Sequence, residues 1–408
     1  MQSKSSIKTG RKDRSLTKRA KTSRLSKLNE KQTSLPALSA LIDVPSFDQL
    51  VPTQTQRDAY GLCVEHLQEA GVSSAQLELA CVVRLDRGFP AVVSSVGVFR
   101  VEFSARVTKG DNSKVAVGDW VCARIPLDHD MGIIEAILPR KSEIARWRGS
   151  ARGEKQTLAA NVDVTFVVQA LDERKISIDR IVRSVVIALD SDVHAVVVLT
   201  KTDSVSPATL KRYLTLIHEV LGDAVTTIVT SSKLEVSHKS SCDEMKQIVQ
   251  KFHACWGIDA IREEIPQESV AIVLGESGAG KSTLLNALLG HEALETGEVR
   301  VSDNAGRHTT VARRMVALPK AGIIVDEPGL RSLPVVGHEQ GLTKVFPKIS
   351  RAAAACKFRD CTHVHEPGCG VRAALQAGEY SSAQVDAYLS LAHEMKVSAR
   401  LLDPDVVL

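Results

Sequence analysis

The pattern of apolar and polar positions divides the chain into segments of different period. From about Glu78, short β-rich runs are separated mostly by Gly, Ser, Asp, Asn and Pro, a pattern typical of strands joined by tight turns. Five such strands in about sixty residues predict a small antiparallel barrel, with the OB-fold as first choice. The runs are Cys81–Leu85, Ala91–Val93, Val96–Phe103, Val115–Val121 and Gly132–Leu138.

From Asn161 the pattern changes to buried strands that alternate with amphipathic helices. Val164–Leu171 and Ala195–Leu199 are continuous apolar runs, as expected for strands inside a parallel sheet. Between them, apolar residues recur at helical spacing from Ile178 to Leu189. This alternation predicts a three-layer α/β domain, followed by a mainly helical C-terminal segment. Further strands are predicted at 226–230, 270–274 and 322–325.

The composition is that of a globular protein with unevenly distributed charge. The chain has 408 residues, of which 44% are hydrophobic and 25% charged, and its formal net charge is +4. Because no apolar run approaches the roughly twenty residues that cross a membrane, no membrane partner is expected. Residues Met1–Lys31 carry eleven Lys/Arg against two acidic residues, which concentrates the basic character in one arm.

The basic arm has few large apolar residues and is predicted to be disordered when free. We favour a phosphate-binding arm that becomes ordered on nucleic acid. A solubilising tail and an organellar transit peptide are the alternatives. No apolar segment precedes a small-residue cleavage site, which argues against secretion. The eight cysteines show no disulfide framework, so we expect a reduced, cytoplasmic protein.

A phosphate-binding loop is predicted at Gly275–Ser282. The buried strand Val270–Leu274 runs into it and a helix at 282–289 leaves it, which is the context that this motif requires. The loop's glycines let backbone N–H groups face a polyphosphate. Lys281 would reach the β- and γ-phosphates, and the Ser282 hydroxyl would bind Mg²⁺. The predicted nucleotide contacts here are Gly275, Glu276, Ser277, Gly278, Ala279, Gly280, Lys281, Ser282 and Thr283.

Base recognition is predicted at Thr200–Asp203, directly after a buried strand. Guanine presents two adjacent donors on its Watson–Crick edge, and an ionised Asp203 accepts both, whereas adenine presents a donor beside an acceptor. Thr200 stands where GTPases usually have Asn, so an amide that braces the loop is lost, and we expect weaker affinity more than a changed base. The residues predicted around the base are Thr200, Lys201, Thr202 and Asp203, with Ser231 and Ser232 closing the pocket through backbone amides.

A metal and γ-phosphate element, Asp326–Gly329, follows the last predicted strand. Asp326 would hold Mg²⁺ through water, and the Gly329 N–H would contact the γ-phosphate. The base-reading element therefore comes first in the chain, the phosphate loop second and the metal element last. Since loops at one edge of a parallel sheet meet whichever strand comes first, this order predicts a circularly permuted GTPase.

The switch segment is predicted at Gly306–Thr310, where we favour Thr310 as the residue that completes the Mg²⁺ shell. Leu330 stands where Ras-like GTPases place the glutamine that orients the attacking water. We therefore expect slow intrinsic hydrolysis that a partner accelerates. The predicted catalytic residues are Lys281, Thr310, Asp326 and Gly329, and the predicted Mg²⁺ ligands are Ser282, Thr310 and Asp326.

A Cys/His cluster at 356–369 predicts a zinc site. Three thiolates and one imidazole fill the tetrahedral shell of Zn²⁺, so a structural metal, one per chain, is expected. A disulfide is disfavoured because three cysteines leave one unpaired. His365 is an alternative to His363, although the Glu-Pro pair that follows it predicts a turn. The predicted ligands are Cys356, Cys361, His363 and Cys369.

Together these elements resemble the bacterial family of GTPases that depend on the small ribosomal subunit, RsgA or YjeQ. The resemblance extends from about Glu78 to about Met395. It implies an OB barrel, a permuted GTPase domain and a zinc subdomain that bind the maturing small subunit and its rRNA, with hydrolysis stimulated by that subunit. The motifs that carry it include Ala160–Asp163, Gly306–Thr310 and Cys356–Cys369, and the departures from the family are Thr200, Glu276 and Glu327.

The predicted function is therefore a GTP-hydrolysing biogenesis factor for the small (30S) ribosomal subunit. It would be a cytoplasmic monomer that uses GTP/GDP, Mg²⁺ and one structural Zn²⁺. The alternative is a regulatory GTPase acting on a protein partner, with the barrel and the zinc segment as protein-binding modules. The predicted segments are 1–77, a basic disordered arm and connector; 78–146, the OB-fold barrel; 147–345, the circularly permuted GTPase domain; and 346–408, the zinc-binding C-terminal domain.

Overall fold

The fold is described from a computed structural model of the chain. The residues that the structure describes are 38, 41, 43–86, 89–109, 115–126, 131–148, 154–174, 177–231, 239–292, 313–326, 335 and 337–402. The chain divides into two compact units, Met1–Ile42 and Asp43–Leu408, and every element below belongs to the second. The basic arm at 1–31 lies outside the described residues. No helix in the described part of the chain is long and apolar enough to cross a membrane.

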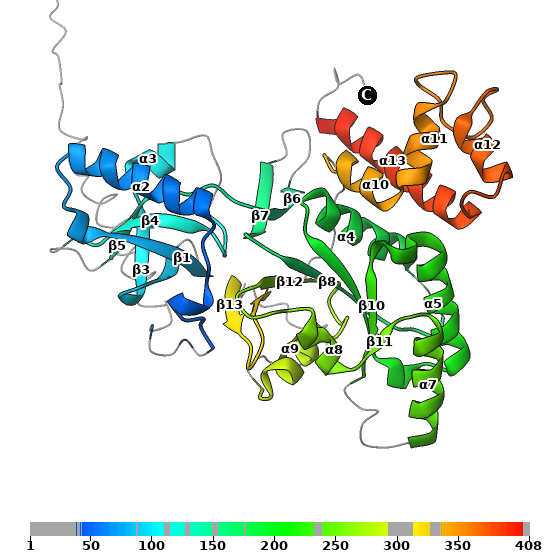
Figure 1. Cartoon of the computed structure of the whole chain (residues 1–408), viewed down its shortest axis with the longest axis horizontal. Helices are drawn as coiled ribbons and strands as arrows, with labels where there is room; N and C mark the ends of the chain where they lie inside the picture. The colour runs from blue at the N-terminus through cyan, green and yellow to red at the C-terminus, as the bar shows by residue number, and fades with distance from the viewer. Residues whose placement is uncertain are drawn as a thin grey trace, which may run out of the picture. The chain divides into compact units, whose positions relative to one another are not determined.

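A closed barrel occupies the first part of the second unit (Figure 1). Its strands are β1 (Leu77–Asp86), β2 (Phe89–Ser94), β3 (Gly97–Phe103), β4 (Trp120–Arg124) and β5 (Gly132–Ile137). Strand β1 pairs with β2 and β4, and β5 pairs with β3 and β4, so these described strands close into a ring. Every second side chain, such as Val82, Val101 and Ile134, fills the interior.

Two details of the barrel differ from the sequence prediction. The β3–β5 pairing is parallel, because α3 (Ala105–Lys109) and β4 separate these strands in the chain and β5 closes the ring against β3. The strand expected at Val115–Val121 begins only at Trp120. The residues before it form a turn in which the Asp119 N–H donates to the Ala116 carbonyl oxygen (3.2 Å).

The connector before the barrel contains α2 (Gln54–Glu69). Its N-cap is Thr53, whose hydroxyl accepts a hydrogen bond from the Gln56 N–H. Leu67 of α2 packs with Cys122 of β4, so the helix covers one side of the barrel.

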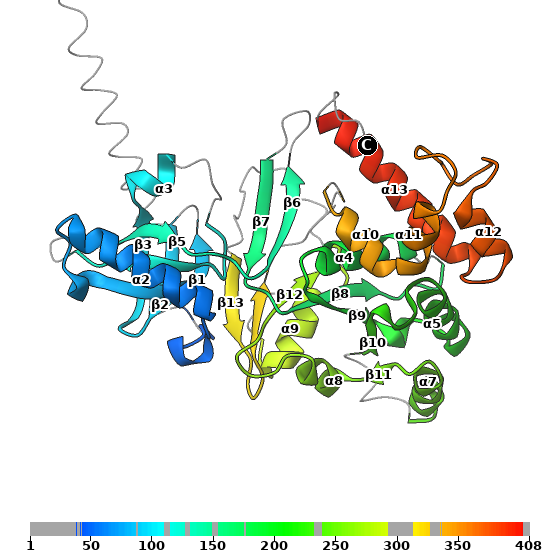
Figure 2. The same cartoon turned by 45° about the horizontal axis from the view of Figure 1, so that its top comes forward.

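A mainly parallel sheet with helices on both faces follows the barrel (Figure 2). Its spatial order is β11-β10-β9-β8-β12-β14-β13, with β13 antiparallel to β14. The strands are β8 (Val164–Ala170), β9 (His194–Thr200), β10 (Thr226–Val229), β11 (Cys255–Trp256), β12 (Val270–Leu274), β13 (Arg313–Ala317) and β14 (Ile323–Asp326).

The two faces of this sheet carry different helices because side chains alternate along each strand. Val167 and Val197 pack on the side of α4, α5 and α7, whereas Phe166 and Val196 pack on the side of α8 and α9. This is the layered α/β arrangement that the alternating sequence pattern predicts. The helices are α4 (Ile178–Asp190), α5 (Pro207–Leu221), α7 (Lys239–Lys251), α8 (Ile258–Glu263) and α9 (Lys281–Leu289).

The barrel and the α/β sheet are joined in two ways. Strand β13 pairs with β1 through Arg84↔Arg314 and Leu85↔Arg313, so the sheet continues from one into the other. In addition, an antiparallel hairpin of β6 (Glu143–Arg148) and β7 (Glu154–Ala160) lies between them in sequence. The sequence pattern did not predict this hairpin, and its first strand crosses the boundary expected between residues 146 and 147.

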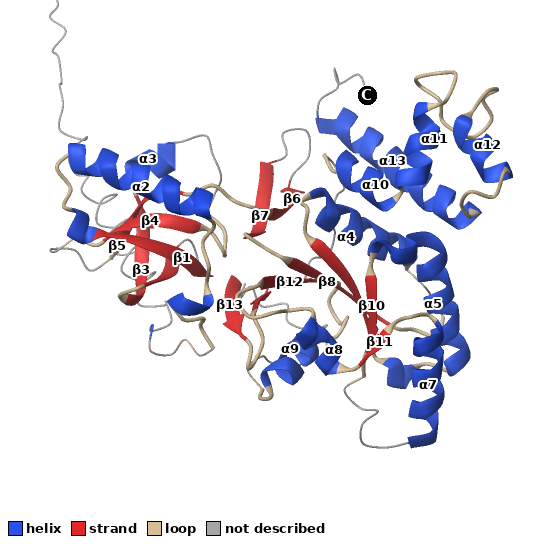
Figure 3. Ribbon diagram, in the orientation of Figure 1, coloured by secondary structure: helices blue, strands red, loops and turns tan. Residues whose placement is uncertain are grey.

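The C-terminal segment is helical (Figure 3) and shares a core with the α/β layer. Leu342 and Phe346 belong to the same buried cluster as Val186 of α4 and Leu210 of α5. At Gly341 a Cβ would lie 2.1 Å from the Val186 carbonyl oxygen, so only glycine allows this approach of α10 to α4. The helices are α10 (Glu339–Val345), α11 (Pro347–Ala354), α12 (Gly370–Gln376) and α13 (Ser382–Leu402).

Candidate nucleotide site and metal centre

The predicted phosphate loop connects the end of β12 to the start of α9. A Cβ at Gly275 would lie 2.5 Å from the Val168 carbonyl oxygen of β8, which excludes a larger residue. Gly278 and Gly280 have φ values of +80° and +89°, a region that side chains disfavour. The close approach to β8 and the positive φ values therefore require glycine at all three positions. Ala279 is buried, whereas Ser277, at the mouth of the loop, is exposed.

Lys281 is folded over this loop. Its Nζ donates to the carbonyl oxygens of Gly275 (2.7 Å) and Glu276 (2.6 Å). Burial lowers the pKa of Lys281, while the nearby charges of Asp326 and Glu276 act in the opposite direction. A phosphate oxygen carries negative charge and these carbonyl oxygens do not, so it would compete well for the ammonium group. Thr283, in the first turn of the same helix, is exposed.

Asp326 ends β14, which pairs in parallel with β12 through Ile272↔Val325. Its carboxylate and the phosphate loop therefore lie at the same edge of the sheet. Burial raises the pKa of Asp326, and the positive charges of Arg314 and Lys281 oppose that rise. A bound divalent cation would favour the ionised carboxylate further.

The predicted Mg²⁺ and catalytic sets are only partly described. Lys281, Ser282 and Asp326 lie at the ends of adjacent elements, as the motifs predict. Thr310 and Gly329 lie outside the described residues, as do Glu327, Leu330 and the whole segment 306–310.

The base-reading loop begins at Thr200, whose side chain contacts the phosphate loop. Its Oγ1 donates to the Ala279 carbonyl oxygen (2.7 Å), and the residue is 5% exposed. The sequence suggested that replacing Asn by Thr would remove a brace from this loop. The structure shows that the Thr200 hydroxyl still braces the loop, through a hydrogen bond to a residue 79 positions later in the chain.

The rest of this loop is held by hydrogen bonds to the segment after β10. Thr202 Oγ1 donates to the Thr230 carbonyl oxygen (2.9 Å) and is fully buried. The Ser231 hydroxyl donates to Asp203 Oδ1 (2.6 Å), so it orients the carboxylate predicted to bind guanine. Lys201 has a φ of +57° and an exposed side chain. Ser232 lies outside the described residues.

We expect Thr200→Val to destabilise the protein by about 1–2 kcal/mol, because it leaves the buried Ala279 carbonyl without its donor. The same change should weaken nucleotide binding several-fold, since the two loops lose their connection. Thermal unfolding and nucleotide titration measure the two effects. Thr200→Ser, which keeps the hydroxyl, is the control and should resemble the wild type; a Val variant indistinguishable from Ser would contradict the brace.

Sequence reasoning missed two arginines near the phosphate loop. Arg180, at the start of α4, forms an ion pair with Glu276, which is one of the departures from the family. Both side chains are roughly half exposed, so the pair adds little stability. Arg314 of β13 acts on Asp326 electrostatically. No sequence signal marks these residues, because their partners are distant in the chain or on a neighbouring strand.

The predicted zinc ligands come together at the end of α11 and the start of α12. The ligand atoms of Cys356, Cys361, His363 and Cys369 all lie within 4.8 Å of one another. His363 Nδ1 is 3.5 Å from the Sγ atoms of Cys356 and Cys369, which are 3.9 Å apart. Tetrahedral Zn²⁺ with bonds of about 2.0–2.3 Å separates its ligands by about 3.5–3.8 Å. The donor set therefore fits zinc.

Neighbouring groups hold these ligands in place. Backbone N–H groups of Gly370 and Arg372 point at the Sγ atoms of Cys356 (3.3 Å) and Cys369 (3.5 Å). Glu366 accepts hydrogen bonds from the Thr362 hydroxyl, the Thr362 N–H (2.9 Å) and the His365 N–H (3.2 Å), and these bonds lower the pKa of Glu366. The alternative ligand His365 is thus in the turn, as expected, and His363 lies with the cysteines.

The chain matches known proteins over most of its length. The family model for the RsgA GTPase matches residues 137–336. A protein of Streptomyces avermitilis named small ribosomal subunit biogenesis GTPase RsgA is 37% identical over 326 residues, which cover 78% of this chain and 81% of that protein. One of the same name from Leptospira interrogans is 36% identical and covers 71% and 75%.

Two solved structures share the fold. YjeQ from Thermotoga maritima aligns with a TM-score of 0.54 at 23% identity, over 78% of this chain and 99% of that one. YloQ, described as a circularly permuted GTPase, aligns with a TM-score of 0.51 at 21% identity, over 80% and 98%.

Motif order, sheet and loop geometry define the class of this protein as a circularly permuted P-loop GTPase with a Cys₃His cluster after the α/β layer. Within that class, both named relatives are more than 30% identical to this chain, and each match covers more than two thirds of this chain and of the relative. The chain belongs to the RsgA GTPase family.

Proposed function

We propose that this chain hydrolyses GTP and acts in the biogenesis of the small ribosomal subunit. The observation that carries the nucleotide part is the hydrogen bond from Thr200 to the Ala279 carbonyl, which joins the base-reading loop to the phosphate loop. Two motifs in permuted order thus lie in one site. The relatives named as small ribosomal subunit biogenesis GTPases support the choice of partner.

In the proposed site, the carboxylate of Asp203 accepts both donors of guanine, and Ser231 and Ser232 close the base pocket. The amides of Gly275–Thr283 and the ammonium of Lys281 bind the phosphates. When bound, Mg²⁺ neutralises charge on the β- and γ-phosphates. Ser282, Thr310 and Asp326 are the residues proposed to hold this ion, and the Gly329 amide is proposed to contact the γ-phosphate.

We also propose the division into an arm with its connector, a barrel, a permuted GTPase domain and a zinc-binding segment from residue 346, where the boundaries expected at 77/78 and 146/147 fall within β1 and β6, and we propose the OB-fold for the barrel. The ring order β1-β2-β3-β5-β4 and the position of α3 between β3 and β4 support that fold. The Cys₃His cluster is proposed to hold one structural Zn²⁺. OB-folds bind oligonucleotides, so the barrel is proposed to contact rRNA of the subunit, with the protein acting as a monomer in the cytoplasm.

We expect slow GTP hydrolysis by the protein alone and a rate at least about ten-fold higher with saturating small ribosomal subunits, because Leu330 cannot orient water. Phosphate release with and without subunits measures this effect. Large subunits at the same concentration are the control. Since binding linkage is reciprocal, a non-hydrolysable GTP analogue should also increase co-sedimentation with small subunits relative to GDP.

Equal hydrolysis rates with and without saturating small subunits would contradict the proposal. That result would favour the alternative, a regulatory GTPase that acts on a protein partner. Hydrolysis of ATP at the same rate as GTP would contradict the assignment of the base-reading loop.

A further inference from the structure

Asn161 lies in the Ala160–Asp163 motif, to which no nucleotide contact is assigned above. Its φ is +57° and it is 5% exposed. Its Oδ1 accepts hydrogen bonds from Gln56 Nε2 (2.8 Å) and the Lys141 N–H (2.9 Å). Its Nδ2 donates to the Gly118 carbonyl oxygen (2.8 Å). One buried amide therefore joins α2, the barrel turn before β4 and the linker from β5 to β6.

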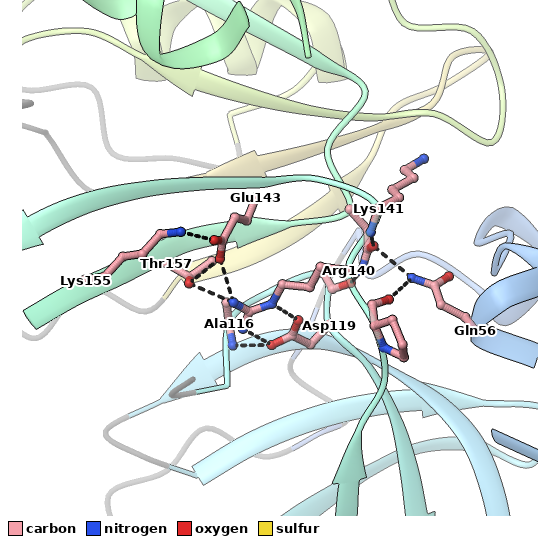
Figure 4. A network of polar contacts seen from close by, with 11 residues as sticks. Gln56, Ala116, Asp119, Arg140, Lys141, Glu143, Lys155 and Thr157 are labelled. Carbon is pink, nitrogen blue, oxygen red and sulfur yellow. Dashed lines mark hydrogen bonds and ion pairs between the residues drawn. The ribbon is translucent and has the colours of Figure 1, made fainter. Parts of the chain in front are cut away.

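Arg140, on the same linker, makes a second connection (Figure 4). Its Nε and Nη2 donate to the two carboxylate oxygens of Asp119 (2.7 and 2.8 Å), a fully buried residue of the barrel turn. Its Nη1 donates to Glu143 (2.8 Å) and Thr157 (2.9 Å) of the β6–β7 hairpin. A bidentate guanidinium pair fixes orientation as well as distance. Burial of Asp119 makes this pair costly to break.

The backbones of the two regions also meet at this point. The Ala160 N–H donates to the Val117 carbonyl oxygen (2.9 Å). A Cβ at Gly118, whose φ is +93°, would lie 2.1 Å from the Ala160 carbonyl oxygen. The barrel turn therefore packs directly against the end of β7.

Asp163 continues this junction into the nucleotide-binding sheet. Its Oδ2 accepts a hydrogen bond from the Val270 N–H (2.9 Å), its N–H donates to the Val270 carbonyl (2.7 Å), and its Oδ1 pairs with Lys141 Nζ (2.6 Å). Val270 is the first residue of β12, and the phosphate loop begins five residues later, at Gly275. At about 3.3 Å per residue, the junction is about 16 Å from the loop.

On its other side the linker borders an open cleft of about 670 Å³, where Lys141 and Ser142 face Asp190 and Asp192 of the end of α4. The linker is thus hydrogen-bonded on one side and bordered by open space on the other. Leu138, at the start of the linker, belongs to the buried core, whereas Lys141 and Ser142 border the cleft.

We propose that Asn161 and Arg140 are positioning residues that couple the barrel to the phosphate loop. The path runs from the barrel turn through the linker and Asp163 to the first residue of β12. That a ribosomal partner acts through this path rests on the proposed function. The coupling between barrel and phosphate loop is a property of the chain and can be tested without a partner. Coupling is reciprocal, so nucleotide at the loop must also change the stability of the barrel turn.

Hydrogen exchange of the full-length protein tests this coupling without ribosomes. In the wild type, a saturating non-hydrolysable GTP analogue should slow exchange of the 115–119 amides about five-fold. Asn161→Gly removes the buried amide yet tolerates the positive φ. Arg140→Lys keeps the charge but loses the bidentate pair. Both variants should bind the analogue with wild-type affinity and lose its effect on the barrel turn.

A matched control makes the same chemical change inside the barrel. Arg124 pairs with Glu135 (2.7 Å), and both belong to barrel strands, so Arg124→Lys should keep the nucleotide effect. If Asn161→Gly does not fold, the comparison of Arg140→Lys with Arg124→Lys decides alone. In the presence of small subunits, Arg140→Lys should hydrolyse GTP at least about ten-fold more slowly than the wild type, while its basal hydrolysis rate without subunits is unchanged. A merely structural residue would alter the basal rate or subunit binding instead.

The proposal is wrong if the analogue leaves exchange at 115–119 unchanged in the wild type, or if both junction variants respond as the wild type does. A wild type that small subunits fail to stimulate contradicts the proposed function, whereas the exchange experiment still decides the coupling.

Discussion

Replacing Asp203 by Asn is expected to lower GTP affinity about a hundred-fold. The substitution removes the carboxylate that accepts hydrogen bonds from two guanine donors, and this loss costs about 3 kcal/mol of binding free energy. Xanthine nucleotides should gain affinity, because xanthine presents an acceptor where guanine has its amino group and the new amide can donate to it. The loop itself should stay in place, since Ser231 can donate to the Asn side chain as it does to Asp203 Oδ1 (2.6 Å).

Titration of GTP, ATP and xanthosine triphosphate against both proteins measures this exchange of specificity. Asp259→Asn is the matched control, because Asp259 is 90% exposed and pairs with its neighbour Arg262 in α8. Unchanged GTP affinity in the Asp203 variant would remove the basis for calling this loop base-reading. A similar loss for ATP and GTP would indicate a folding defect.

The nucleotide motifs could be predicted from sequence because each is local. The phosphate loop needs a strand, glycines and a helix within about twenty residues, and all are found in place. The glycine positions are dictated by nearby backbone, as at Gly275 against the Val168 carbonyl. The alternating pattern likewise predicted the sheet and its two helical layers, since burial on both faces leaves a continuous apolar run.

The contacts between segments could not be predicted in this way. The parallel β3–β5 pairing depends on how the ring closes, which no local pattern encodes. The β6–β7 hairpin carries mixed polar residues and lacks a strong period. The junction at Asn161 depends on partners 20 to 105 residues away. The contact of Thr200 with Ala279 could not be predicted either, because the two residues are distant in the sequence.

The choice between two histidines in the Cys/His cluster shows where sequence spacing stops being informative. His363 and His365 both lie between Cys361 and Cys369. The backbone decides between them: His363 has a φ of +64° and its Nδ1 is 3.5 Å from two Sγ atoms, whereas the His365 N–H is held by Glu366 in the turn. Tertiary geometry is needed to resolve such a pair.

Cys361→Ser in the full-length protein is expected to abolish zinc binding and to unfold the segment from Cys356 to Gln376, including α12. A structural zinc contributes about 10–16 kcal/mol, which is as large as the whole stability of a typical domain. Cys361 is 6% exposed, so the Ser hydroxyl would also be buried without the metal. Helix α13 should be weakened but remain packed, because Leu391 and Met395 belong to the core shared with α4 and α5.

Metal analysis of freshly purified, reduced protein should give one zinc per chain in the wild type and none in the variant. Hydrogen exchange should show loss of protection in α12, while nucleotide affinity stays within about two-fold because the phosphate loop belongs to separate elements. Cys255→Ser is the control, since Cys255 is an exposed thiol of β11 outside the cluster. A wild type without zinc, or a Cys361 variant that keeps one zinc and a protected α12, would contradict the metal assignment. If instead α4 and α5 lost protection and nucleotide affinity collapsed, the shared core would make the zinc segment part of the nucleotide-binding fold.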